Sequence, residues 1–323
     1  MLGNVTIHAM PYEKELEVAR RIAAQAGRLA LENQARGFES ETKPDDSPVT
    51  SADRANERLI TKLLEEAFPN DGILGEEGAA REAHNGRRWL IDPIDGTRSF
   101  MRGIPTWGVM LALEAEGNVV VGACNLAALG ELYFAAAGRG AYCNGKRIHC
   151  SPAKTPHQAM LCLTGFDKVV KHSWGARLLP WLTQFWSVRS MGGSMDAMCV
   201  ASGRAEVWIT MEAQAWDLAP LRIIGEEAGA SFFNLDGKSS IYGGSCVITI
   251  PALENEIRGF LGIDSRKQRP QAGNQRRSKD HDAAMRFDSG AGSVRNVSGG
   301  RDSGRRAGDN LRRPRIHHDS KNV

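Results

Sequence analysis

One segment constrains this chain more than any other: the run W-L-I-D-P-I-D-G-T from residue 89 to residue 97. Its apolar, strand-like start ends in two carboxylates, Asp92 and Asp95, which stand three residues apart. Pro93 lacks a backbone N–H and biases Asp92 toward an extended conformation, so both carboxylates can point to one place beyond the strand. Carboxylates this close repel each other unless a cation or a proton lies between them. Mg²⁺ is the simplest occupant at neutral pH, because it prefers oxygen ligands and shares them with phosphates.

The next two residues favour the same kind of site. Gly96 and Thr97 offer unobstructed N–H groups where a helix can begin. Such a position is favourable for a phosphate oxygen. The segment therefore predicts a combined metal and phosphate site.

Length and composition exclude several classes of protein. With 323 residues and 41% hydrophobic content, the chain can bury the core of one large or two modest domains. The six cysteines are scattered without a Cys-x-x-Cys pair, which argues against a disulfide framework and against a zinc site. Neither a run of ~18 apolar residues nor a signal-peptide pattern is present. We therefore expect reduced thiols in a cytoplasmic protein with no membrane partner.

The charge is distributed unevenly along the chain. Residues 264–323 hold 15 Lys/Arg and 7 Asp/Glu, whereas residues 1–263 hold 26 Lys/Arg and 31 Asp/Glu. The basic segment is rich in Gly, Ser, Asn and Asp, and its few apolar residues follow no period. It is predicted to be a disordered tail. Electrostatic binding of nucleic acid by this tail is a rival function from another class, which would require strongly salt-dependent affinity, but nucleic acid is not the expected partner.

Truncation after Ile263 tests the predicted domain boundary. We expect the shortened protein to keep its thermal stability and its kinetics nearly unchanged, because the removed segment cannot bury enough apolar surface to add a core. Thermal melting and activity would be measured on both forms. A marked fall in melting temperature, or a loss of dimerisation, would show that the domain extends past Ile263.

Hydrophobic periodicity predicts the elements before residue 150. Apolar positions at helical spacing indicate helices over residues 12–34 and from Thr50 to the residue before Pro69, with a loop through residues 43–48 between them. Strands are expected at residues 72–74, 89–91, 108–113, 119–124 and 131–136. Glu116-Gly117-Asn118 and Asn144-Gly145 are typical of tight turns between antiparallel strands.

After about residue 152 the pattern alternates between strand and helix, which is typical of a sheet covered by helices. The expected helices are at residues 174–185, 194–201 and 218–228, and the expected strands are at residues 160–163, 188, 205–209, 231–233 and 246–250.

Three motifs follow each other in order: Gly75-Glu76-Glu77, then residues 91–97, then W-D-L-A-P at residues 216–220. Together they resemble the inositol monophosphatase-like family of metal-dependent phosphomonoesterases. The resemblance extends to S-P-V-T-S-A-D at residues 47–53 and to Gly192-Gly193-Ser194, and so covers about residues 12–262. It implies an α/β (α+β) fold layered as an αβαβα sandwich. Residues 1–263 would form the phosphatase domain, with the metal and nucleophile half at about 1–150 and the substrate half at about 151–263.

The resemblance also implies a set of site residues. The metal ligands would be Glu76, Asp92, the main-chain carbonyl of Ile94, Asp95 and Asp217. They would hold two or three Mg²⁺ ions, with Mn²⁺ able to substitute. Four hard carboxylates arriving from three chain segments suit the clamping of two cations.

The catalytic group implied by the family is Asp53, Thr97 and Glu76. Thr97, with Asp53 as its acidic partner, would orient a metal-bound water, and the N–H groups of Gly96 and Thr97 would bind the phosphate.

Each of these residues also has a simpler structural explanation. Asp53 could close a capping box with Thr50, Glu76 could belong to a solvated turn, Asp217 could cap a helix that begins at Leu218, and Thr97 could be a cap. Only the joint occurrence of all the motifs in the right order favours the functional interpretation. A catalytically silent scaffold remains a further alternative, against which the complete ligand set argues.

The substrate is predicted from the less regular positions. Pro105-Thr106-Trp107-Gly108 is similar to the histidinol-phosphate phosphatase branch, although Trp107 could simply be a core aromatic residue. The substrate-binding residues implied by the family map to Asp95, to Ser194 and to a position that usually holds an acidic residue but is Thr210 here, with Glu212 two positions later. This departure argues against inositol, and a shift of one or two residues in the alignment would bring Glu212 into the pocket.

We expect a Mg²⁺-dependent phosphatase of a small phosphorylated metabolite. L-histidinol phosphate, hydrolysed to L-histidinol in histidine biosynthesis, is the first expectation. Inositol 1-phosphate is the alternative, and fructose 1,6-bisphosphate and 3'-phosphoadenosine 5'-phosphate are less favoured. Family habit implies a homodimer.

Overall fold

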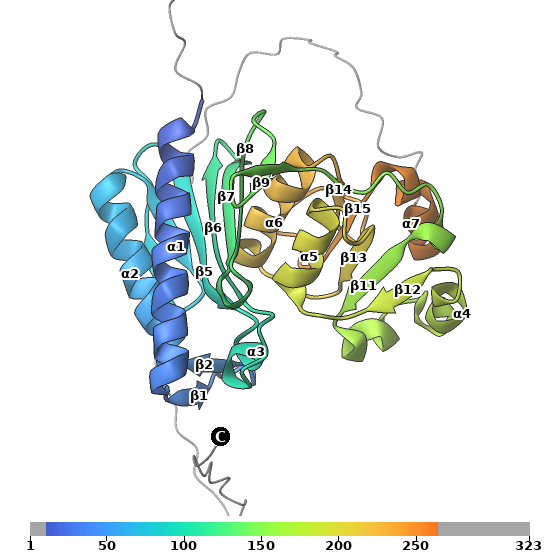
Figure 1. The fold of residues 1–323 in the computed structure, drawn as a ribbon, viewed down its shortest axis with the longest axis horizontal. Helices are drawn as coiled ribbons and strands as arrows, with labels where there is room; N and C mark the ends of the chain where they lie inside the picture. The colour runs from blue at the N-terminus through green and yellow to red at the C-terminus, as the bar shows by residue number, and fades with distance from the viewer. Residues whose placement is uncertain (1–10, 264–323) are drawn as a thin grey trace, which may run out of the picture. The chain divides into compact units, whose positions relative to one another are not determined.

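The computed structural model describes residues 11–263, which form stacked layers of helices and sheets (Figure 1). The predicted disordered tail lies outside the described residues. The helices are α1 (Glu13–Arg36), α2 (Ser51–Ala67), α3 (Thr97–Met101), α4 (Leu178–Leu182), α5 (Gly193–Ala201), α6 (Ala215–Glu227) and α7 (Glu254–Leu261).

Two large sheets and one small one hold the strands. The eight-stranded sheet has the order β10 (Lys146–Ile148), β9 (Ala141–Cys143), β8 (Glu131–Ala136), β7 (Asn118–Leu126), β6 (Gly108–Ala115), β5 (Arg87–Asp95), β3 (Gly72–Gly75), β4 (Ala80–Arg81), and only its β3–β5 pair is parallel. The five-stranded sheet has the order β12 (Ser187–Arg189), β11 (Met160–Thr164), β13 (Val207–Thr210), β15 (Cys246–Thr249), β14 (Ser231–Phe233). A separate hairpin pairs β1 (Ser40–Thr42) with β2 (Pro48–Thr50).

Alternation along the strands explains the layers. On β5, Trp89 and Ile91 pack in a core with α1 and α2, whereas Leu90 faces a second core that contains residues of α5 and α6. In the second sheet, Cys162 and Trp208 belong to that same central core. Their strand neighbours belong to a third core, which contains residues of α4 and α7. The layer order is therefore αβαβα, as predicted.

Strand β5 carries the most informative departure from regular pairing. It was expected to end at Ile91, but it continues to Asp95, and its register against β6 shifts between Asp92 and Asp95. Pro93 lies within this irregularity, where a missing N–H breaks no regular ladder bond. Because of this irregularity, Asp95 departs from the strict alternation of side chains between the two faces of the sheet.

Other expectations need correction. The helix expected over residues 174–185 is wrong in length, because only Gly175–Arg177 (3-10) and Leu178–Leu182 (α4) are helical. Pro180 has no N–H to continue the hydrogen-bond ladder, and tertiary packing of Trp181 against Phe260 holds this short segment in place. Helix α6 begins at Ala215 rather than Leu218, and the expected loop around residues 43–48 joins the strands of a hairpin.

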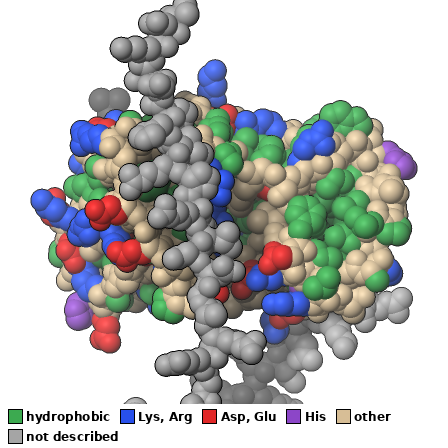
Figure 2. All heavy atoms as spheres, turned by 90° about the horizontal axis from the view of Figure 1, so that it is seen from below, with side chains coloured by type: hydrophobic (Ala, Val, Ile, Leu, Met, Phe, Trp, Pro, Cys, Tyr) green, Lys and Arg blue, Asp and Glu red, His purple; other side chains and the backbone are tan. Residues whose placement is uncertain are grey.

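The six cysteines are all free thiols, and none forms a disulfide, as expected. Within residues 11–263 no helix is long and apolar enough to cross a membrane. Figure 2 shows hydrophobic side chains gathered on the right-hand part of the face seen from below, and charged side chains more frequent on the left. The most exposed large hydrophobic residues of the described surface are Val170, Leu179 and Trp186.

Candidate active site

A cavity of about 340 Å³ collects most of the predicted site residues. Its wall combines the end of β5, the start of α3, the first turn of α6 and the ends of β11 and β13. The predicted residues that line it are Glu76, Asp92, Ile94, Asp95, Gly96, Thr97, Thr210, Glu212 and Asp217. Asp53 and Ser194 do not line it, although both contact residues that do.

Three aspartates of the cavity share one arrangement: a main-chain N–H holds one oxygen of each carboxylate. The bonds are Ile94 N to Asp92 Oδ1 (3.0 Å), Ser194 N to Asp95 Oδ2 (2.9 Å) and Gln214 N to Asp217 Oδ2 (2.7 Å). Anchoring one oxygen fixes the side-chain rotamer and leaves the second oxygen for another partner. The cap expected at Asp217 is present, but it closes a capping box with Gln214.

These aspartates lie in an unfavourable electrostatic environment. Burial, followed by the negative charges of Glu76, Asp217 and Asp95, raises the pKa of Asp92 well above its usual range. Burial and the charge of Asp95 also raise the pKa of Asp217, whose carboxyl lies within hydrogen-bonding reach of Asp92. A cation between them would relieve this repulsion.

Asp53 serves two partners at once. Its Oδ2 accepts the N–H of Thr50 (2.8 Å) and completes the capping box at the start of α2. Its Oδ1 lies 3.2 Å from the Thr97 hydroxyl, which also lies 3.1 Å from the carbonyl oxygen of Ile94. The structural and the functional interpretations of Asp53 are therefore compatible. Burial raises the pKa of Asp53, and its hydrogen bonds to Thr50 and Thr97 oppose that rise.

Lys43, in the turn between β1 and β2, is a site neighbour that the sequence did not reveal. Its Nζ contacts Glu76 Oε1 at 2.9 Å and Glu77 Oε1 at 2.6 Å. Burial alone would lower the pKa of Lys43, but the hydrogen bonds to Glu77 and Glu76 outweigh burial and raise it. The Glu76-Glu77 pair is therefore no solvated turn, since Glu77 is mostly buried.

Glu57 binds the same turn, and the sequence did not reveal this residue either. Its carboxylate accepts the N–H groups of Glu77 (2.8 Å) and Ala79 (2.8 Å). A Cβ on Gly75 would stand 2.3 Å from Glu57 Oε2, so this glycine is required by the close approach. Glu57 follows Asp53 by one helical turn, which was a usable signal in the sequence.

The predicted substrate residues fall into different positions. The Ser194 side chain is fully buried and its hydroxyl has no partner, so its contact with the site is the backbone N–H that holds Asp95. The Thr210 hydroxyl donates to the carbonyl of Glu212 (3.2 Å). The Glu212 side chain is 66% exposed and pairs with Lys168 at 3.2 Å. Glu212 therefore stands at the mouth of the cavity.

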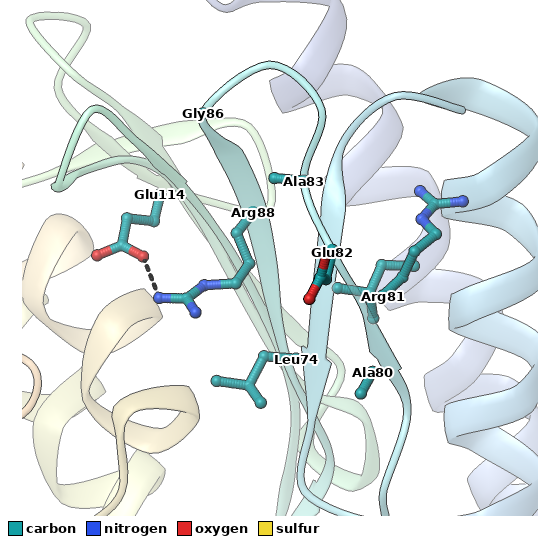
Figure 3. Close-up of a pocket in the computed structure, with 9 residues that line it drawn as sticks. Leu74, Ala80, Arg81, Glu82, Ala83, Gly86, Arg88 and Glu114 are labelled. Carbon is teal, nitrogen blue, oxygen red and sulfur yellow. Dashed lines mark hydrogen bonds and ion pairs between the residues drawn. The ribbon is translucent and has the colours of Figure 1, made fainter. Parts of the chain in front are cut away.

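A larger cavity, of about 600 Å³, lies against β3, β4 and β5 but contains none of the predicted site residues (Figure 3). Its arginines already have partners. Arg88 points toward Glu114 and contacts it at 2.7 Å, and Arg81 donates to the carbonyls of Phe68 and Asp71. The smaller cavity is consequently the better candidate for catalysis.

The donor set of the smaller cavity fits a hard divalent cation. Five carboxylate side chains line the cavity, namely Glu212 at its mouth and the four predicted ligands Glu76, Asp92, Asp95 and Asp217, and Ile94 adds a main-chain carbonyl, without histidine or cysteine. Within residues 11–263, the side chains as they are placed form no group of three or more His, Cys, Asp or Glu that could hold a metal ion. Magnesium commonly completes its shell with water and substrate phosphate, so an open set of ligands is compatible with this ion.

Comparison with known proteins agrees with this fold. The model of the family described as "Inositol monophosphatase family" matches residues 12–285, a range that continues past Ile263 into residues the structure does not describe. The histidinol-phosphatase of Chlorobaculum parvum is 39% identical over 236 residues, which cover 73% of this chain and 91% of that protein. The inositol-1-monophosphatase of Rhizobium meliloti is 34% identical over 194 residues, or 58% of this chain and 73% of that protein.

A solved structure is similar to this fold over most of its length. The IMPase of Thermotoga maritima superposes with a TM-score of 0.70 at 27% identity, and covers 77% of this chain and 96% of that one. Fold and relatives together define a phosphoric monoester hydrolase. The chain belongs to the inositol monophosphatase family, whose members are generally metal-dependent phosphatases.

Proposed function

We propose that this phosphatase hydrolyses L-histidinol phosphate to L-histidinol with Mg²⁺ as its cofactor. The observation that carries the phosphatase chemistry is the cavity in which anchored aspartates meet the Thr97–Asp53 pair. The choice of histidinol phosphate is supported by the similarity to histidinol-phosphatases and by the acidic residue Glu212 at the cavity mouth.

The proposed ligands are Glu76, Asp92, Asp95, Asp217 and the carbonyl of Ile94. When bound there, divalent cations supply Lewis acidity toward the phosphate and lower the pKa of a water molecule. The anchored carboxylates hold fixed positions, because a main-chain N–H restrains each of the three aspartates. Their contribution is therefore a pre-organised set of oxygens that need not reorient during the reaction.

The proposed proton acceptor is the Thr97–Asp53 pair. When the Thr97 hydroxyl donates to Asp53 Oδ1, its oxygen lone pairs can accept a proton from the attacking water. The proton of the water would pass to Thr97 while the Thr97 proton passes to Asp53. Burial raises the pKa of Asp53 and so makes it a stronger base than an exposed aspartate.

Phosphate recognition is proposed for the turn that precedes α3. Gly96 has a φ of +83°, and a Cβ there would stand 3.2 Å from the Thr106 carbonyl oxygen. Glycine therefore permits this turn, which brings the N–H groups of Gly96 and Thr97 to the cavity wall. These two N–H groups would donate to the phosphoryl oxygens.

A substrate panel tests the proposal. Phosphate release would be measured with histidinol phosphate, inositol 1-phosphate, fructose 1,6-bisphosphate and 3'-phosphoadenosine 5'-phosphate, each with and without Mg²⁺. We expect the highest kcat/KM with histidinol phosphate and Mg²⁺. A preference for inositol 1-phosphate would replace the substrate but keep the phosphatase, and no turnover of any ester would refute both.

Glu212→Gln is expected to raise KM for histidinol phosphate about threefold to tenfold with little change in kcat. Histidinol phosphate carries an ammonium group, and the Glu212 carboxylate already binds the ammonium of Lys168 at the cavity mouth. KM for inositol 1-phosphate, which has no cation, should change less than about twofold. Steady-state kinetics on both esters measures the difference.

Asp236→Asn is a matched control for this variant. Asp236 is also an exposed carboxylate paired with a lysine, Lys238, but it does not line the cavity. The control should leave both KM values unchanged. Equal effects of Glu212→Gln on the two esters would refute the role of Glu212 in choosing a cationic substrate.

The state of the protein in solution is a further part of the proposal. Following the family resemblance, we propose a cytoplasmic homodimer. Light scattering coupled to gel filtration should give twice the mass of one chain, and a mass of one chain would refute the dimer.

A further inference from the structure

The wall of the cavity formed by the second sheet contains a chain of three polar side chains. Thr164, at the end of β11, and Trp208, on β13, both line the cavity. The Trp208 Nε1–H donates to Thr164 Oγ1 at 3.0 Å. Behind them, the Thr164 hydroxyl donates to Oδ2 of the fully buried Asp196 on α5, with 3.4 Å between the two oxygens.

Counting donors and acceptors shows what this wall offers. A threonine hydroxyl has one hydrogen and two lone pairs. The hydrogen is directed to Asp196 and one lone pair receives the Trp208 N–H. The remaining capacity of Thr164 is one acceptor lone pair, and a molecule in the cavity can reach it because Thr164 lines the wall.

We propose that Asp196 is a positioning residue that fixes the Thr164 hydroxyl as a hydrogen-bond acceptor, so that the cavity selects phosphate esters whose alcohol part carries an N–H or O–H donor. This inference deepens the proposed function, on which it rests, because histidinol carries such donors in its ammonium group and imidazole. The Asp196 carboxylate does not line the cavity itself, so it reaches a bound ester through the Thr164 hydroxyl and through the backbone at Gly192, which also lines the cavity.

The surroundings of Asp196 support this role. Its carboxylate accepts the N–H groups of Met191 (3.1 Å) and Gly192 (3.4 Å) as well as the Thr164 hydroxyl. Burial raises the pKa of Asp196 to about 6, and the hydrogen bonds that its carboxylate accepts from Met191, Gly192 and Thr164 oppose that rise. A carboxylate can only accept, so the hydroxyl between Trp208 and Asp196 has a single favourable orientation.

The decisive variant is Asp196→Asn, which keeps the shape and one acceptor oxygen. When that oxygen accepts the N–H of Met191, the new amide N–H₂ group faces Thr164. The Thr164 hydroxyl then accepts a hydrogen bond from the amide, and the hydroxyl hydrogen is free to point into the cavity. We expect KM for histidinol phosphate to rise about tenfold, the size of one hydrogen bond. KM for phenyl phosphate, whose alcohol part has no donor, should stay within about twofold, as should kcat for both esters.

Two substitutions at Thr164 provide matched controls. Thr164→Val removes the acceptor and should match Asp196→Asn, whereas Thr164→Ser keeps the hydroxyl and should behave like the wild type. The double variant should be no worse than Thr164→Val alone, because both changes would remove the same interaction. Additive effects, or equal rises of KM for both esters, would overturn the inference and leave Asp196 as a support of the loop at Met191 and Gly192.

The remaining outcomes are also decisive. If Asp196→Asn does not fold, as shown by thermal melting, the comparison of Thr164→Val with Thr164→Ser still decides, and equal KM values for these two would overturn the inference. If the wild type does not hydrolyse histidinol phosphate, the proposed substrate fails. Thr164→Val and Thr164→Ser, assayed with inositol 1-phosphate, then test the wall by itself against phenyl phosphate, because inositol hydroxyls can both donate and accept and only the loss of the Thr164 hydroxyl removes their hydrogen bond.

Discussion

Asp92→Asn and Asp217→Asn are each expected to lower kcat by about a thousandfold or more while the protein stays folded. Each change removes one charged oxygen donor from the cavity, and metal-ion stabilisation contributes several kcal/mol to phosphoryl transfer. Asparagine keeps an oxygen for the main-chain N–H that anchors each aspartate, so the bonds from Ile94 and Gln214 can persist. Phosphate release at saturating Mg²⁺ measures the loss.

Thermal melting of Asp92→Asn is part of the same prediction. Burial and neighbouring charges raise the pKa of Asp92, so a neutral amide relieves repulsion and the melting temperature in metal-free buffer should stay equal or rise. Asp71→Asn is the matched control, since Asp71 is a buried acid that binds the indole N–H of Trp89 (2.9 Å) and Arg87 (3.2 Å) away from the cavity. The control should lose about 1–3 kcal/mol of stability and keep its kcat. Near wild-type kcat in Asp92→Asn would refute the metal mechanism.

Removal of divalent cations with EDTA is expected to abolish turnover, and Mg²⁺ or Mn²⁺ should restore it. The cavity offers oxygen donors, which these hard ions prefer. Ca²⁺ in excess should inhibit, because its larger and more flexible coordination shell suits the geometry poorly. The family resemblance also implies inhibition by lithium. Full activity in metal-free buffer would contradict this account.

A measurement without substrate separates metal binding from catalysis. An ion that binds only the folded protein stabilises it, by about 2.7 kcal/mol at a hundred times its Kd. Mg²⁺ should therefore raise the melting temperature of the wild type. The same addition should have a much smaller effect on Asp92→Asn, and an equal shift in both proteins would place the ion elsewhere.

Local patterns in the sequence were sufficient for the parts of the fold that local interactions determine. The apolar run Trp89-Leu90-Ile91 correctly predicted a strand, which the structure buries on both faces. The capping box of Thr50 and Asp53 marked the start of α2. The short helix α4 was predicted too long, because its length depends on Pro180 and on packing against α7.

The residues that were missed depend on contacts between distant parts of the chain. Lys43 reaches Glu76 across 33 positions, and Asp196 reaches Thr164 across 32. No periodicity connects such pairs, so only the folded structure brings them together. Ser194 illustrates the opposite case, since its position near the site was foreseen but the group that faces Asp95 is its backbone N–H.

Residues that belong to or follow strands of both large sheets line the cavity, and the two groups of residues have different proposed roles. The four carboxylates proposed as metal ligands come from β5, the turn after β3 and α6. Thr164 ends β11, Trp208 and Thr210 lie on β13, and the fifth carboxylate, Glu212, follows β13. Under the proposed function, mutations in the second sheet should therefore alter which alcohol is accepted while the proposed metal and phosphate residues stay untouched.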